Sequence, residues 1–143
     1  MTEFDITEGK KVIRSFTDLR VWQEAHQLVL EIYRITRAFP PVEQYGLGSQ
    51  MRRAAVSITS NIAEGFTRIT SKEKRQYYVI AQGSLTEIQS QLFVARDERY
   101  IDEKTFGMIF QHSTEVNKLI NGLKRSIPDT KLNTKYQIPD TKY

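Results

Sequence analysis

The sequence predicts an all-α fold, a single-domain antiparallel four-helix bundle with up-down-up-down order. Its 143 residues suffice for one compact domain but not for two ordinary ones. No proline, the strongest helix breaker, occurs in residues 42–127. Within this length apolar residues recur at steps of three and four, and no segment alternates apolar and polar residues with hairpin signals. Several amphipathic helices joined by short links are typical of a bundle.

The first two helices are predicted at residues 18–38 and 49–66. The first follows an apolar stripe and ends where Pro40 and Pro41 remove backbone donors. The second begins after the Gly46 and Gly48 turn and ends near Gly65. The two stripes consist of Trp22, Ala25, Val29, Ile32, Thr36 and Phe39, and of Met51, Ala54 or Ala55, Ile58, Ile62 and Phe66.

The third and fourth helices are predicted at residues 71–98 and 103–126. Thr70 and Glu73 have the spacing of a capping box, in which each side chain bonds the other residue's backbone amide. Asp102 is a suitable N-cap for the last helix, and Pro128 stops it. Short links between the four helices predict antiparallel neighbours.

The flanks of the bundle differ from it in composition. We expect a flexible N-terminal segment at 1–16, the bundle at 17–127 and a mobile C-terminal tail at 128–143, where Ile-Pro-Asp-Thr-Lys occurs twice. The N-terminus lacks the basic and apolar pattern of a secretory signal, and no apolar run approaches the roughly 20 residues of a membrane span. We therefore expect a cytoplasmic protein without membrane contact.

The usual sequence marks of enzymes, cofactors and metals are missing. A carboxylate-bridged metal site in a bundle needs Glu-x-x-His on two helices, whereas this chain has two histidines and only the reversed His112-x-x-Glu115. Cysteine is absent, and so are phosphate-binding loops and nucleophile elbows. The sequence predicts no metal, no cofactor and no enzymatic activity, with the histidines as partly exposed polar residues.

Basic residues are the better candidates for a binding site. Lysine and arginine exceed the acids by 21 to 17, a net charge of +4. In an up-down bundle one end brings together Arg34 and Arg37 from the first helix with Arg52 and Arg53 from the second. The planar guanidinium suits phosphate oxygens. Two interpretations stay open: a nucleic-acid footprint, or solvated bases that complement helix dipoles and pair with acids.

Polar and small residues beside the apolar stripes predict a structural seam between the second and third helices. These residues are Ser57, Asn61, Glu64, Gly83, Ser84 and Glu87. The third and fourth helices also carry more apolar residues than one bundle needs, among them Ile80, Phe93, Val94 and Met108. Such a surplus indicates partner subunits, so we expect a homo-oligomer.

Four ordered motifs resemble one known family. They are Phe16-x-Asp18-Leu19-x-Val21-Trp22-Gln23-x-Ala25, Tyr45-Gly46-Leu47-x-x-Gln50-Met51-Arg52-Arg53-Ala54, Ser57-Ile58-x-x-Asn61-Ile62-Ala63-Glu64-Gly65 and Ala81-x-Gly83-Ser84-x-x-Glu87. Over residues 16–127 the set resembles the bacterial four-helix-bundle family of 23S rRNA intervening-sequence proteins, also labelled S23 ribosomal protein-like. The duplicated tail lies outside the family pattern.

The resemblance implies a ring of identical subunits, typically a homopentamer. Similar proteins include the accessory variability determinant of diversity-generating retroelements, a basic pentamer that binds nucleic acid and a reverse transcriptase. One hypothesis is a non-enzymatic oligomeric accessory protein that contacts RNA or DNA phosphates through Arg52 and Arg53, supported by Arg34 and Arg37. The alternative is a scaffold that recruits a reverse transcriptase or another enzyme without touching nucleic acid.

Overall fold

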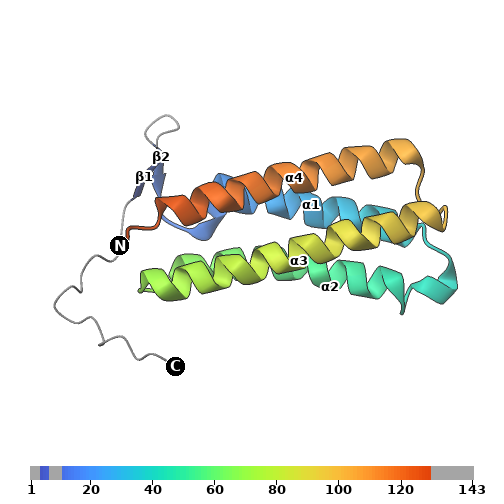
Figure 1. Cartoon of the computed structure of the whole chain (residues 1–143), viewed down its shortest axis with the longest axis horizontal. Helices are drawn as coiled ribbons and strands as arrows, with labels where there is room; N and C mark the ends of the chain where they lie inside the picture. The colour runs from blue at the N-terminus through green and yellow to red at the C-terminus, as the bar shows by residue number, and fades with distance from the viewer. Residues whose placement is uncertain (1–3, 7–10, 130–143) are drawn as a thin grey trace, which may run out of the picture.

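Four long helices make up most of the chain that the structure describes. The structure is a computed structural model that describes residues 4–6 and 11–129. The helices are α1 (Arg20–Arg37), α2 (Leu47–Thr67), α3 (Ser71–Asp97) and α4 (Glu103–Ser126). Each packs on its chain neighbour, and α1 closes the bundle against α4 (Figure 1). The predicted all-α four-helix bundle is confirmed.

The helix ends lie where the capping residues were expected. The Thr70 hydroxyl accepts the Glu73 amide at 3.1 Å, which is one half of the predicted capping box. The Asp102 carboxylate accepts the Thr105 amide at 2.7 Å, and this backbone bond, the largest influence, lowers the pKa of Asp102. These caps satisfy amides that the helix itself leaves unpaired.

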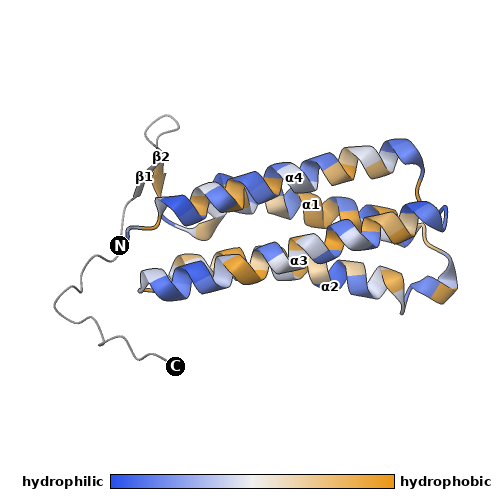
Figure 2. Ribbon diagram, viewed as in Figure 1, coloured by the Kyte–Doolittle hydropathy of each residue, from blue (hydrophilic) through white to orange (hydrophobic). Residues whose placement is uncertain are grey.

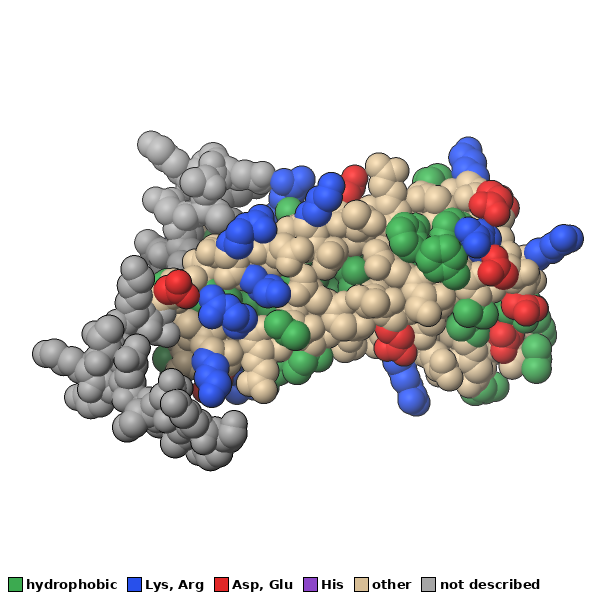
Figure 3. Space-filling view, viewed as in Figure 1, with side chains coloured by type: hydrophobic (Ala, Val, Ile, Leu, Met, Phe, Trp, Pro, Cys, Tyr) green, Lys and Arg blue, Asp and Glu red, His purple; other side chains and the backbone are tan. Residues whose placement is uncertain are grey.

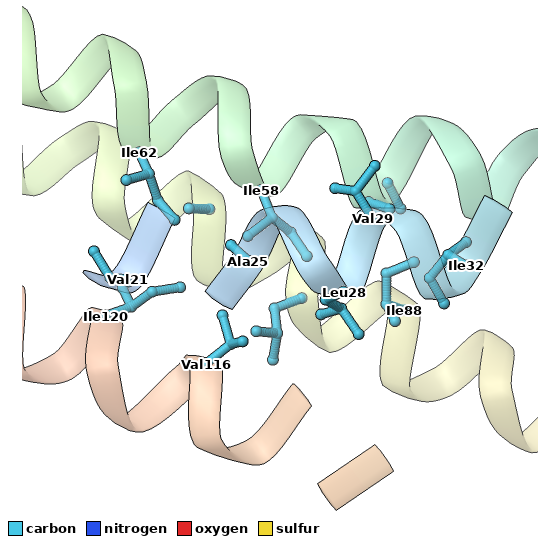
Figure 4. Packing of buried hydrophobic residues seen from close by; sticks show 14 of the residues in the cluster. Val21, Ala25, Leu28, Val29, Ile32, Ile58, Ile62, Ile88, Val116 and Ile120 are labelled. Atoms are coloured by element: carbon cyan, nitrogen blue, oxygen red, sulfur yellow. The ribbon is translucent and has the colours of Figure 1, made fainter. Parts of the chain in front are cut away.

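The core runs along the axis of the bundle. Each helix turns its apolar stripe inward and its polar face outward (Figure 2). In the middle, Leu28, Ile58, Ile88 and Val116 from the four helices are fully buried against one another (Figure 4). The spacing of three and four that predicted the helices therefore also identified their buried face.

Small residues bring α2 and α3 close together. A Cβ on Gly65 would lie 2.5 Å from Cε1 of Tyr78, so only glycine fits beneath that ring. Two turns along, the Ser57 and Ser84 hydroxyls bond each other at 2.7 Å. Burial of the Tyr78 ring raises the pKa of its hydroxyl to about 12.

A short hairpin precedes the bundle. Strands β1 (Phe4–Ile6) and β2 (Lys11–Ile13) pair antiparallel, with Phe4 opposite Ile13. Ile13 is 1% exposed and belongs to the core. Ile13 thus connects the second strand to the bundle, and the expected flexibility of residues 1–16 stays a prediction. The expected mobile tail lies outside the described residues from position 130 onward.

In the part of the chain that the structure describes, no helix has both the length and the hydropathy that a membrane span requires.

Candidate nucleic-acid interface

A groove of about 450 Å³ lies along the outer side of α2 and reaches α1. We call it the Arg53 groove, and its lining residues are Tyr33, Ser49, Arg52, Arg53, Val56, Ser57 and Ser60. All but Tyr33 belong to one stripe of α2, because positions three and four apart share a helix face. Tyr33 projects from the last turns of α1. The groove therefore joins guanidinium groups, hydroxyls and an aromatic ring.

Arg52 helps to build the connection between α1 and α2. Its Nη2 donates to the Gln44 carbonyl at 2.9 Å. The Gln44 side chain in turn donates to the carbonyls of Thr36 and Phe39 at 3.0 Å each. A guanidinium carries five N–H donors, so one structural bond leaves others for a ligand. Arg52 is a structural residue with spare donors.

Arg53 is exposed beside it, and no described residue forms a hydrogen bond or ion pair with its side chain. Arg34 and Arg37, also exposed, occupy the last turn of α1 outside the groove lining. There they complement the helix dipole. The structure thus brings the arginine pair of α2 together in one groove and leaves the pair of α1 on the adjacent helix end.

The predicted polar seam is only partly a seam. Ser57 and Ser84 bond across α2 and α3, and the Asn61 amide donates to the Ser57 carbonyl at 2.7 Å. Glu64 instead pairs with Arg68 near the surface, at 2.9 Å. Gly83 and Glu87 are also exposed on the outer side of α3, where a Cβ on Gly83 would meet nothing within 4 Å. The seam is thus confined to the positions nearest the α2–α3 contact.

A second polar seam, between α3 and α4, was not predicted. The Gln82 amide donates to Asn117 at 3.0 Å and to Asn121 at 2.8 Å. Lys124 donates to the Gln82 side-chain oxygen at 2.9 Å. The spacing of Asn117, Asn121 and Lys124, four and three residues apart, could have predicted this seam. It places the three side chains on one face of the helix, beside the apolar stripe.

His112 of α4 joins two carboxylates of α1. Its Nδ1 bonds Glu31 and its Nε2 lies 3.0 Å from Glu24. Burial alone would lower the pKa of His112, but the bonds to Glu31 and Glu24 and their charges outweigh it and raise the pKa above its ordinary 6.5. Both ring nitrogens are engaged, and the described residues contain no group of three or more potential ligands placed to hold a metal ion. The histidine is a bridge between helices.

Arg96 lies at the same end of the bundle as the Arg53 groove, but its guanidinium already contacts two aromatic rings and two carboxylates. Its guanidinium stands over Phe93 and Phe106, at 4.9 and 4.6 Å from the ring centroids. Its Nε bonds Asp97 at 3.0 Å and lies 3.9 Å from Glu103. We call these five residues the Arg96 cluster. Figure 3 shows hydrophobic side chains with acidic ones beside them at this end of the bundle.

The opposite end of the bundle is also basic. Figure 3 shows lysine and arginine gathered where α3 begins and α4 ends. Several of these bases have structural partners: Arg68 pairs with Glu64 and stands 4.8 Å from the Tyr77 ring. Lys74 donates to the Phe66 carbonyl at 2.8 Å, and desolvation lowers its pKa. Lys72 and Arg75 line a hollow with Val79 and Ile80. This Lys72 hollow is the main alternative to the Arg53 groove as a binding site for an anionic ligand.

One solved structure shares the fold of this chain, and one family model matches its sequence. A crystal structure of a protein of unknown function from the S23 ribosomal protein family of Bacteroides thetaiotaomicron VPI-5482 has a TM-score of 0.68 and 22% sequence identity. The match covers 74% of this chain and 99% of that one. No curated protein is significantly similar to the sequence. The family model described as 23S rRNA-intervening sequence protein matches residues 17–122. With most of the bundle inside this match, the chain belongs to the 23S rRNA-intervening sequence protein family.

Proposed function

We propose that the protein is a non-enzymatic accessory protein that binds RNA or DNA phosphates in the Arg53 groove. The observation that carries the proposal is the exposed Arg53 guanidinium, beside Arg52 and without a partner among the described side chains. An arginine without a carboxylate partner gains charge-assisted hydrogen bonds when a phosphate arrives, whereas a carboxylate that already pairs with an arginine repels the phosphate. Arg34 and Arg37 add positive charge from the adjacent end of α1.

Two further features support a polyanionic ligand. The net charge of +4 favours approach of nucleic acid from any direction. The groove is shallow and elongated along one helix face, so it suits a chain that passes along the surface. Contacts of this kind fix position on a backbone and do not read bases.

Filter binding of labelled RNA and DNA over a salt series tests the proposal. Affinity should fall steeply as salt rises, because each neutralised phosphate releases counterions. Arg53→Ala should weaken binding and lower the salt slope by about one unit. Arg75→Ala, the same charge change in the Lys72 hollow, is the matched control and should change little. No binding at low salt, or equal effects of the two variants, would overturn the proposal.

We also propose that the protein acts as a homo-oligomer. Phe93 is 42% and Met108 59% exposed, and an apolar surface of this kind favours association. The subunit number of five comes from the family resemblance. A ring would multiply the weak charge of each chain into a stronger field. Light scattering should give a mass well above the 16.7 kDa of one chain. A single-chain mass at micromolar concentration would refute the oligomer.

The second candidate function is a scaffold for a protein partner, which the resemblance suggests is a reverse transcriptase. It is favoured by exposed Val79 and Ile80 on α3, away from the Arg53 groove. Affinity capture with nuclease treatment separates the two functions. A protein partner that survives nuclease supports the scaffold, and recovery of nucleic acid alone counts against it.

A further inference from the structure

The Arg53 groove contains a tyrosine that the bundle does not use. Tyr33 is 37% exposed at the groove wall, and among the described residues its ring has no aromatic, cation–π or side-chain hydrogen-bond partner. Val56, 39% exposed, adds aliphatic surface from α2. The exposed part of the Tyr33 ring beside the arginines is a surface available to a flat ligand.

Hydroxyl groups complete the lining. Ser49 and Ser60 line the groove, and no described residue is hydrogen-bonded to either side chain. Ser57 is engaged with Ser84 and contributes to the wall only. One volume of about 450 Å³ thus holds an aromatic face, open guanidinium donors and small hydroxyls. Sites for small ligands range over roughly 300–1,000 Å³, so the groove has room for a nucleotide unit.

We propose that the groove selects single-stranded nucleic acid, with one base stacked on Tyr33 and the neighbouring phosphate held by Arg53. This inference rests on the proposed function and names its ligand class. A duplex offers phosphates but keeps the faces of its bases stacked inside the helix, so Tyr33 has nothing to stack on. A single strand offers both, and stacking on an aromatic ring tolerates any base.

The experiment measures fluorescence anisotropy of three labelled ligands of about 12 units, a length within the usual footprint of single-strand binders. They are a single-stranded RNA, the matching duplex, and a single strand of abasic units that has phosphates without bases. The proteins are the wild type, Tyr33→Ala, Tyr33→Phe, Tyr45→Ala and Arg53→Ala. Tyr45 is the matched control because it is 95% exposed at the same end of the bundle and lies outside the groove.

The wild type should bind the single strand more tightly than the duplex or the abasic strand. Tyr33→Ala should weaken single-strand binding about tenfold and leave the other two ligands unchanged. Tyr33→Phe should keep the wild-type affinity, since the ring and not the hydroxyl makes the stack. Tyr45→Ala should change nothing. Thermal unfolding of each variant verifies that the bundle is intact.

Two results would overturn the inference and leave the proposed function standing. One is equal binding of single strand and duplex, both weakened by Arg53→Ala and neither by Tyr33→Ala. The other is a loss in Tyr33→Ala that is equal for the normal and the abasic strand. Absence of binding to all three ligands would reject the proposed function together with the inference.

Discussion

The Arg53 groove and the Arg96 cluster are both arginine–aromatic assemblies at one end of the bundle, yet they differ in what remains open. Arg96 is 28% exposed, stands over two phenylalanine rings and bonds Asp97. Arg53 has no side-chain partner among the described residues, and Tyr33 has no ring partner. The same residue types therefore stabilise the fold in one place and present unused donors in the other.

The difference shows that arginine content and position at a helix end do not identify a ligand site. An arginine that already stands beside carboxylates has its charge offset by them, so it attracts a phosphate less strongly. An open arginine loses only water. The number of partners distinguishes the two arginines. Phe93 and Asp97 are near Arg96 in sequence, whereas Phe106 and Glu103 reach it only through the packing of α4 on α3.

The largest expected effect is on binding. Arg53→Glu should lower the affinity for single-stranded RNA by about 10–100-fold at low salt, because hydrogen bonds to charged groups contribute roughly 1.5–3 kcal/mol and each 1.4 kcal/mol is tenfold. Arg96→Ala should stay within about twofold of the wild type. Titrations at one salt concentration compare the variants. An equal loss in both would erase the distinction between the two assemblies.

The next effect is on stability, and here Arg96 should matter more than Arg53. Arg96→Ala should reduce the free energy of unfolding by about 1–2 kcal/mol, since it removes two cation–π contacts and the packing of the arginine stem. Arg96→Lys should restore only part of this loss, because lysine lacks the planar group that covers the rings. Arg53→Ala should remain within about 0.5 kcal/mol of the wild type. Urea unfolding measures all three, and a neutral Arg96→Ala would show that the cluster is not saturated as described.

A smaller effect is expected at the His112 bridge, where a side chain with structural partners should again affect stability and not binding. The folded-state pKa of His112 is raised, so its stabilising charge is fully present below pH 6.5 and is lost as pH rises through the raised pKa. The wild type should therefore lose stability as pH rises from 6.5 through the raised pKa of His112. His112→Gln should remove this loss without changing RNA affinity. His26→Gln, the same change at a histidine whose ring stacks on Trp22 with the centroids 4.8 Å apart, is the matched control for the substitution itself. A flat wild-type profile would contradict the bridge.

Most of the fold was predictable from local patterns. The apolar stripes defined four helices, and Thr70, Asp102 and Pro128 placed three of their ends. The largest differences between predicted and observed helix ends are two residues, at the starts of α1 and α2. The hairpin was missed because strands of three residues are too short to show alternation. The burial of Ile13 depends on tertiary contact with the bundle, which its neighbours in sequence do not encode.

Less of the site was predictable. The pairing of helix ends brought Arg52 and Arg53 into consideration, but Arg52 also bonds the Gln44 carbonyl, which depends on the path of the α1–α2 connection. His112 was compared with Glu115 on its own helix, whereas its partners Glu24 and Glu31 lie more than 80 residues away. Tyr33 was not selected, because exposure of one tyrosine at a helix face is a property of the packed bundle.

Ultraviolet cross-linking tests most directly where nucleic acid lies on the bundle. Irradiation of the complex with single-stranded RNA, followed by trypsin and nuclease digestion, leaves a nucleotide on the side chains that stack against bases. Tyr33 falls in the tryptic peptide of residues 21–34, and fragmentation separates it from Trp22. The account predicts an adduct on Tyr33 that is lost in Arg53→Glu. Adducts confined to Tyr77 or Phe66 at the opposite end, with none on Tyr33, would contradict it.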